Sequence, residues 1–306
     1  MRSSLWILSL ALSAPAACAT LAPAPAYADD DDDDEYESNW IGARLGIWYR
    51  PEIHMRADVG GNQGGLLGLI GGTDFDIERT LGVEQNIHSE YTPDLNQNAL
   101  WELEFFVDTD LFSVYVTLVP PYEYHGTKTL TEQIEFGGQV FNASTNVKSV
   151  FEQMLVSLDA TFNIFDNRYF KLAPLAGIRF LLIDWELEET TGGLKADTSD
   201  IDSPFSWEDF EIFPTPELGL DVRVGYRDIF EVGGRVSASY VQYLDMEGGT
   251  YRAELFVRLY PIPILGIEVG YRFLLYDISS RTDDPTQNWD FDLEFSGFTA
   301  AVTLRF

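Results

Sequence analysis

The strongest constraint on the fold is a two-residue repeat of apolar and polar side chains that recurs along most of the chain. In the first segment, Ile41, Ala43, Leu45 and Ile47 alternate with glycine or arginine. Successive side chains of a β-strand point to opposite faces, so each repeat predicts a strand with one apolar face. The repeats span residues 41–47, 101–107, 112–118, 156–164, 170–182, 218–224, 232–240, 251–259, 265–273 and 298–306.

The connections between these segments distinguish a membrane barrel from a soluble sandwich. Those near residues 108–110, 166–168, 226–229 and 261–263 are short, and those near 59–98, 135–140, 189–207, 245–249 and 279–290 are longer. Alternating short turns and long loops are typical of outer-membrane barrels, and a sheet in lipid must close because its edges cannot be hydrated. The sequence therefore predicts an all-β fold, a closed antiparallel up-and-down transmembrane β-barrel of about ten strands.

The N-terminal region predicts export. Residues 1–28 combine Arg2 with the apolar run 5–12 and read as a signal peptide, with small-residue cleavage sites at 17–19 and 26–28, of which the second is favoured. Residues 29–39 follow as an acidic tail, with aspartate at every position from 29 to 34. An even strand number places both chain ends on the short-turn, periplasmic side, and residues 40–306 form the barrel.

Charge and cysteine content exclude several functions. The net charge is −31, which excludes nucleic-acid binding because phosphate contacts need a basic face. Apolar residues make up 45%, too many for a disordered acidic chain. The single cysteine, Cys18, lies in the predicted signal peptide, so the exported chain has no disulfide, thiolate metal site or cysteine nucleophile.

The last nine residues carry the one family motif. Phe298 to Phe306 alternate and end in phenylalanine, which resembles the assembly signal of Gram-negative outer-membrane β-barrel proteins. The resemblance implies location in the outer membrane of a Gram-negative bacterium. It also implies partners, namely the barrel assembly machinery, outer-membrane lipid and lipopolysaccharide. The resemblance indicates where the protein is located and how it is assembled, but it implies no particular activity.

If the apolar faces meet lipid, the opposite faces fill the lumen with nearly balanced charge. A ten-strand barrel is scarcely wider than an eight-strand one, whose interior side chains just fill the space, so ion pairs are expected to plug the lumen. The predicted set comprises Arg44, Arg56, Arg179, Arg223, Arg235, Arg252, Arg258, Arg272, Glu102, Glu104, Glu217, Asp221, Glu254 and Glu268.

Histidines supply the candidate catalytic groups. His54 lies two residues from Glu52, and His125 two residues from Glu123, so each pair is expected on the lumen face of one strand. Such pairs could act in acid–base catalysis, although structural pairing is more frequent. The chain also resembles omptin proteases in its ten strands and acidic outer loops, but no match to their histidine–aspartate pairing is found.

The long connection at 59–98 differs from the other loops. Its residues 60–72 are glycine-rich but apolar and lack the lysine of a phosphate-binding loop, so we expect a lid or plug on the outer mouth. No metal site or cofactor is expected beyond a loop-bound divalent cation. The acidic candidates for it are Asp197, Asp200 and Asp202, and separately Asp283, Asp284, Asp290 and Asp292.

Three functions remain open at this level. The preferred interpretation is a non-enzymatic barrel with an envelope-structural, adhesion or narrow-transport role. The alternatives are a hydrolase acting on lipid or peptide at the outer rim, and a channel for small or apolar solutes. A hydrolase needs a histidine beside a nucleophile or water-holding carboxylates, whereas a channel needs a continuous gap through the charged lumen.

Overall fold

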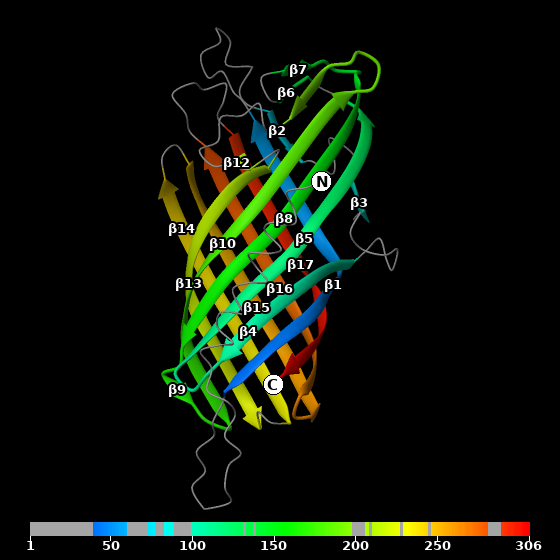
Figure 1. Cartoon of the computed structure of the whole chain (residues 1–306). Coiled ribbons are helices and arrows are strands. Elements are labelled where there is room, and N and C mark those ends of the chain that lie inside the picture. The colour runs from blue at the N-terminus through cyan, green and yellow to red at the C-terminus, as the bar shows by residue number, and fades with distance from the viewer. Residues whose placement is uncertain are drawn as a thin grey trace, which may run out of the picture.

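Ten long antiparallel strands form one closed barrel (Figure 1). The computed structural model describes residues 39–59, 73–76, 83–88, 99–130, 133–136, 139–197, 206–207, 210–226, 229–243, 246–280 and 289–306. The barrel strands are β1 (Trp40–Val59), β4 (Ala99–Asp108), β5 (Phe112–Thr129), β8 (Asn146–Phe162), β10 (Phe170–Glu189), β13 (Phe210–Tyr226), β14 (Phe230–Tyr243), β15 (Met246–Ile262), β16 (Leu265–Ser280) and β17 (Trp289–Arg305). Because β1 pairs with both β4 and β17, the sheet closes, which confirms the predicted fold.

Seven short strands complete the described sheets. They are β2 (Thr73–Asp76), β3 (Val83–His88), β6 (Ile134–Phe136), β7 (Gln139–Phe141), β9 (Phe165–Asp166), β11 (Lys195–Asp197) and β12 (Ser206–Trp207). β2 pairs with β1, and β3 pairs with β5, whereas β6 and β7 form a separate hairpin. Within the described ranges, no helix is long and apolar enough to span a bilayer.

The two ends of the barrel differ. β1 starts where β17 ends: the Ile41 amide donates to the Phe306 carbonyl at 3.0 Å, and the Phe306 amide donates to the Ile41 carbonyl at 2.7 Å. The connections β4–β5, β8–β10, β13–β14 and β15–β16 lie at this same end, which we call the short-turn end (Figure 1). The opposite end is called the far end.

One expected loop is strand instead. Residues 245–249 were predicted as a longer connection, but β14 and β15 pair as far as Tyr243 and Met246, with Tyr240 opposite Gly249. The strands are longer than a membrane requires: β10 has 20 residues and β5 has 18, against about 9–11 for a span. The barrel wall therefore continues beyond any membrane-spanning zone.

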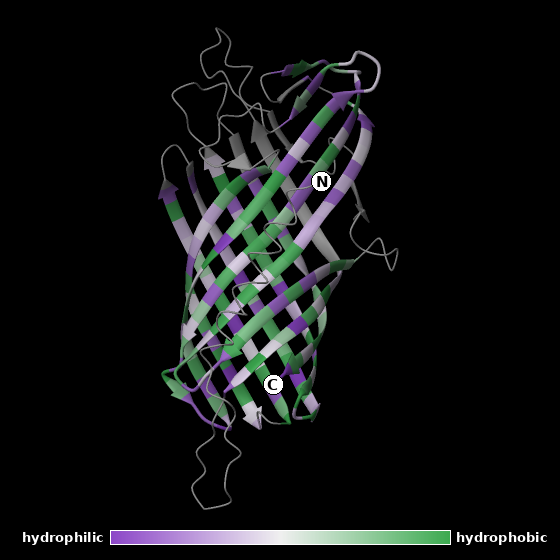
Figure 2. Ribbon diagram, in the orientation of Figure 1, coloured by the Kyte–Doolittle hydropathy of each residue, from purple (hydrophilic) through white to green (hydrophobic). Residues whose placement is uncertain are grey.

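The two halves of the barrel have opposite interiors. Hydrophilic and hydrophobic residues alternate along the strands (Figure 2), and the direction of each side chain decides which of them face the lumen. In the short-turn half, leucines such as Leu218 and Leu255 point outward and are exposed, whereas charged side chains point inward. In the far half, the inward side chains are large and apolar, including Phe151, Trp185 and Tyr276, and are almost fully buried. The polarity of the inward face thus inverts partway along the strands.

Two register shifts accompany this inversion. The pairing of β5 with β8 shifts between Val119 and Tyr122, and the pairing of β1 with β17 shifts between Tyr49 and Glu52. Each shift contains a proline, Pro120 and Pro121 in one and Pro51 in the other. An extra residue in one strand exchanges the faces of every later side chain, so both strands reverse parity there.

Parts of the predicted domain organisation lie outside the described residues. These are the signal peptide (residues 1–28), nearly all of the acidic tail (29–39) and most of the glycine-rich connection (59–98). They stay predictions.

Candidate functional site

The candidate site is the charged interior of the short-turn half. Its arginines and carboxylates alternate with outward apolar residues, so strand geometry alone directs them into the lumen. The buried basic residues are Arg44, Lys171, Arg179, Arg223, Arg235, Arg252, Arg272 and Arg305, and the buried acidic residues of this half are Glu102, Glu104, Asp108, Asp159, Glu217, Asp221, Glu231, Glu254 and Glu268. Arg258 lies among them with a side chain that is 12% exposed.

Shared carboxylates join these residues into a continuous network. Arg44 donates to Glu268 through Nε at 3.0 Å and through Nη2 at 2.6 Å, and it also contacts Glu102. Arg272 contacts the same Glu102 and donates to Glu254 at 2.7 Å. Four strands, β1, β4, β15 and β16, are thereby connected through their side chains across the interior.

Other pairs join strands far apart in the sheet. Arg252 on β15 donates to Asp159 on β8 at 2.8 Å, although β10, β13 and β14 separate these strands on the shorter path around the barrel. Arg223 on β13 donates to the Tyr115 hydroxyl on β5 at 2.7 Å. Such contacts run across the lumen, so the network fills its cross-section.

At the short-turn end, a lysine extends the network toward β4. The Lys171 ammonium is fully buried and donates to Asp108 Oδ1 and Ser113 Oγ, each at 2.8 Å. Ser113 in turn donates to Asp108 at 2.6 Å. Buried charges are tolerated only when paired and hydrogen-bonded, and each of these groups meets that requirement.

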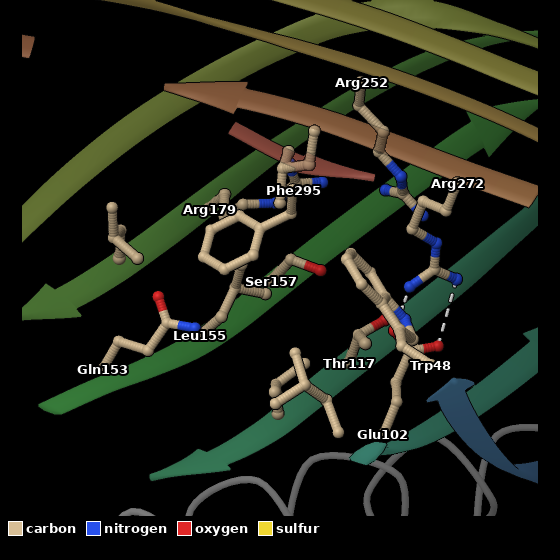
Figure 3. A pocket seen from close by; sticks show the side chains of 14 residues that line it. Trp48, Glu102, Thr117, Gln153, Leu155, Ser157, Arg179, Arg252, Arg272 and Phe295 are labelled. Carbon is tan, nitrogen blue, oxygen red and sulfur yellow. Dashed lines mark hydrogen bonds and ion pairs between the residues drawn. The ribbon is translucent and has the colours of Figure 1, made fainter. Parts of the chain in front are cut away.

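A cavity of about 40 Å³ lies where the charged and apolar interiors meet (Figure 3). Arg252 and Arg272 line one side together with Trp48, whose ring lies 4.9 Å from the Arg272 guanidinium carbon. Gln153 and Leu155 lie on the other side (Figure 3). A space of this size holds only a few waters, so above the ion pairs the interior is closed by packed side chains.

Most of the predicted lumen residues lie in the interior, whereas Arg56 belongs to the part of β1 whose side chains the structure does not describe. The register sets Arg56 opposite Asp292 of β17 and Met55 opposite Leu293. The lumen position of Arg56 stays a prediction.

The predicted lumen placement of the pair His125 and Glu123 is wrong. His125 Nε2 lies 3.1 Å from Glu123 Oε2, but these side chains are 38% and 34% exposed, whereas Tyr122 and Tyr124 fill the interior. This error follows from the register shift in β5, which a repeat read from one end cannot show. On β1, the register sets His54 opposite Glu294 of β17, but the side chains of His54 and Glu52 lie outside the described part of the chain, so the placement of that pair stays a prediction.

Asp108 is an interior residue that the prediction left out of the lumen set. Asp108 was assigned to a turn, although it shares the parity of Glu102 and Glu104 and is 7% exposed. Extending the repeat by two residues would have found it. Arg305 likewise continues the inward row of Thr299 and Thr303.

No group of three or more potential metal-ligating side chains occurs among the described residues. Of the acidic loop candidates for a divalent cation, Asp197 lies in β11, and Asp290 and Asp292 lie in β17. Asp200, Asp202, Asp283 and Asp284 lie outside the described residues.

Comparison with known proteins places the fold in one class. No protein-family model matches the chain, and no curated protein sequence matches it significantly. The outer-membrane protease OmpT from Escherichia coli matches with 13% identity over 90% of this chain and 100% of that chain, at a TM-score of 0.50. OprG from Pseudomonas aeruginosa matches with 9% identity over 90% and 99% of the two chains, at a TM-score of 0.32. The chain thus has the fold of Gram-negative outer-membrane β-barrels, and its terminal Phe306 is consistent with that class.

Proposed function

We propose that this protein is a closed outer-membrane barrel with an envelope-structural or adhesion role. The observation that carries the proposal is the network of buried ion pairs across the lumen, exemplified by Arg252 on β15 and Asp159 on β8. Ions crossing such a lumen would have to displace paired side chains held in fixed geometry. A stable, closed barrel fits an envelope-structural or adhesion role, in which the outer wall and the far end make the contacts and nothing passes through the lumen.

The outward face supports a membrane position for the short-turn half. Leu158, Leu220 and Val302 on this half are roughly half exposed, which suits lipid and not water. Outward residues of the far half, such as Asp184 and Glu294, are acidic and suit water. Short turns face the periplasm in barrels of this class, so the far half projects outside the cell.

The apolar interior of the far half supports the closed state independently. Phe151, Trp185 and Tyr276 are buried to 2% exposure or less and fill the cylinder above the ion pairs. Phe151 packs edge-on against Trp185, with ring centroids 6.3 Å apart. Two different fillings, one ionic and one apolar, therefore lie in series along the axis.

Planar-bilayer recording tests the proposal. The wild-type protein is expected to show little or no steady conductance. A combined variant, Asp159→Ala, Arg252→Ala, Trp48→Ala and Phe295→Ala, removes one ion pair and two cavity-lining rings without leaving an unpaired charge, and it is expected to raise conductance. A stable, large single-channel conductance from the wild-type protein would overturn the closed-barrel proposal in favour of the channel.

A matched control uses the Lys195–Glu186 pair. These two residues lie 2.9 Å apart, and their side chains are 52% and 32% exposed, so they belong to the outer wall and not to the lumen. Replacing both with alanine is expected to leave the conductance unchanged. A rise equal to that of the lumen variant would mean that any loss of stability opens the barrel, and would count against a specific plug.

The C-terminal strand supports assembly by the barrel assembly machinery. Phe306 pairs through its backbone with Ile41 at the seam of the barrel, and its ring is 68% exposed. Because the Phe306 ring makes few contacts with the rest of the barrel, it is available to contact the assembly machinery during insertion. We infer that Phe306 is part of the assembly signal, and lipopolysaccharide and outer-membrane lipid would surround the inserted barrel.

A further inference from the structure

A second cavity, of about 30 Å³, lies inside the short-turn end and is built around Arg305. The Arg305 guanidinium lies against two rings, with its central carbon 4.4 Å from the Trp40 centroid and 3.7 Å from the Tyr260 centroid. Its Nε donates to the Pro263 carbonyl at 2.6 Å. These contacts hold the guanidinium in place at the cavity.

Two N–H donors of this cavity lack partners among the described residues. Arg305 is 5% exposed, and its Nη2 is buried without a hydrogen bond. The indole Nε1 of Trp40, which lines the same cavity, is also buried without one. Buried donors without partners are costly, because each loses its hydrogen bond to water. An acceptor in the cavity would satisfy both groups.

Arg305 is the one charged lining residue of this cavity that forms no ion pair with another described residue. Glu231 accepts from Arg258 at 2.7 Å, and Asp108 accepts from Lys171, so these acids are already engaged. Arg44 donates to Glu268, and Arg223 and Arg235 donate to Asp221, so these arginines are engaged as well. The positive charge of Arg305 is left uncompensated, and the missing acceptor is therefore expected to be an anion.

Size and position identify the anion. The cavity holds at most a few waters, which suits a single carboxylate group and not a nucleotide or a whole phospholipid headgroup. Trp40 lines the cavity and is also the first residue of β1, and Glu37 lies three residues before it. Three residues span at most about 10 Å, so acidic side chains that precede β1 are tethered beside the cavity.

We propose that the short-turn cavity is a carboxylate-binding site whose ligand is the chain's own acidic segment, residues 29–37. Tethering makes the contact intramolecular, with an effective concentration in the millimolar range for a short flexible connection. Arg305 and Trp40 donate to the bound carboxylate, whose negative charge compensates Arg305. The segment is thereby held at the periplasmic mouth. The inference does not depend on whether the lumen conducts.

A binding experiment in detergent micelles tests this. A variant without residues 29–37 is titrated against a fluorescent peptide of residues 29–39, and anisotropy is recorded at low and high salt. The peptide is expected to bind the truncated barrel and to bind the full chain at least about tenfold more weakly, because the tethered segment competes. Equal affinity for both forms, or no binding to the truncated form, would overturn the proposal.

Substitutions localise the site. In the truncated barrel, Arg305→Gln and Trp40→Phe each remove one donor, and each is expected to weaken peptide binding by about tenfold or more. Trp40→Phe keeps a ring stacked on Arg305, so it separates the hydrogen bond from packing. The matched control is Arg168→Gln at the same end, since Arg168 also stacks on a ring, 4.1 Å from the Tyr226 centroid. An equal loss in the control would show diffuse charge attraction and contradict the proposal.

Competing anions distinguish the occupant. A peptide with all acids replaced by amides is expected not to bind, and acetate is expected to compete only at concentrations far above those of the peptide. Inorganic phosphate that competes as effectively as the acidic peptide would show a site for free anions, and would overturn the assignment to residues 29–37. Heat-modifiable gel mobility checks that each variant retains its barrel.

Discussion

Asp221 illustrates how single residues hold the charged interior together. Its carboxylate is fully buried and accepts from Arg223 Nε at 3.0 Å and Arg223 Nη2 at 2.8 Å. Arg235 donates to it as well, at 3.2 Å. Arg235 also lies over the Tyr115 ring, with 4.5 Å to its centroid. A carboxylate bound by two guanidinium groups cannot lose one of them without leaving charge that is poorly compensated.

The change Arg223→Ala is therefore expected to destabilise the barrel by about 3–5 kcal/mol, the range for breaking one partner out of a buried ion pair. The measurement is urea-induced unfolding of the detergent-solubilised protein, followed by tryptophan fluorescence. The exposed pair Lys195–Glu186 gives the control: Lys195→Ala is expected to cost about 0–1 kcal/mol, because solvent screens that pair. Similar losses for the two variants would show that the lumen charges are effectively solvated.

Leu220→Arg probes the outward face at residue scale. Leu220 on β13 is 44% exposed and lies in the short-turn half, where the proposed membrane surrounds the barrel. An arginine there is expected to cost about 2–4 kcal/mol near the bilayer midplane, because the charge enters hydrocarbon. Folding into liposomes, with unfolding by guanidinium, measures the difference.

Thr127 supplies the matched position for this test. It is exposed on β5 beyond the register shift, in the far half. Thr127→Arg is expected to change stability by about 0–1 kcal/mol, since an interfacial or solvated arginine keeps its hydration. If both arginines cost the same, the apolar outward face does not mark a membrane zone.

At the scale of elements, the bulge in β5 separates a segment that lines the ionic interior from a segment that lines the apolar interior. Before it, Tyr115 and Thr117 point into the ionic interior, and after it Tyr122 and Tyr124 point into the apolar interior. The Tyr122 hydroxyl also accepts from the backbone amide of Trp101 on β4. One extra residue allows a single strand to keep inward side chains in both halves.

Deleting Pro120 and Pro121 together is expected to abolish the folded barrel, because β5 is then one residue too short and Glu123 and His125 take the inward positions of the two tyrosines. Pro121→Ala keeps the residue count, and it is expected to fold. Gel mobility without boiling, which reports the closed barrel, compares the two variants. Normal folding of the deletion variant would mean that the register shift does not set which face of β5 is inward.

At the scale of the whole molecule, the inversion of the interior matches two different surroundings. The short-turn half has an apolar exterior and an ionic interior, as a barrel in lipid requires, whereas the far half has an apolar interior like a soluble β-barrel. Strands β5, β8 and β10 run through both halves without a break. One continuous barrel thus has one half suited to lipid and one half suited to water.

This arrangement predicts how the protein behaves in the cell. It is expected to fractionate with the outer membrane and, when unboiled, to migrate anomalously in a denaturing gel, because a closed hydrogen-bonded sheet resists detergent. Cell fractionation and paired boiled and unboiled samples measure both properties. Recovery as a soluble periplasmic protein would contradict the membrane assignment of the short-turn half.

The sequence by itself determined the strand repeat, the barrel class and the charged character of the interior, because side-chain direction within a strand is a local property with a period of two. Residues such as Arg44, Glu102, Arg252 and Glu254 could be assigned to the lumen from parity alone. Local rules also set the tight turn after Asp108, where the Thr109 hydroxyl donates to the Phe112 carbonyl at 2.7 Å.

Only the tertiary structure decided which strands meet and where parity reverses. Arg252 and Asp159 are 93 positions apart in sequence, and their contact exists because closure of the barrel brings β15 and β8 to face each other. The outward positions of Glu123 and His125 depend on the register of β5 against β8, which is a relation between strands. The stacked Arg305 depends on the seam where β1 meets β17. A local repeat carries no information on such pairings, so these features could be found only once the barrel was closed.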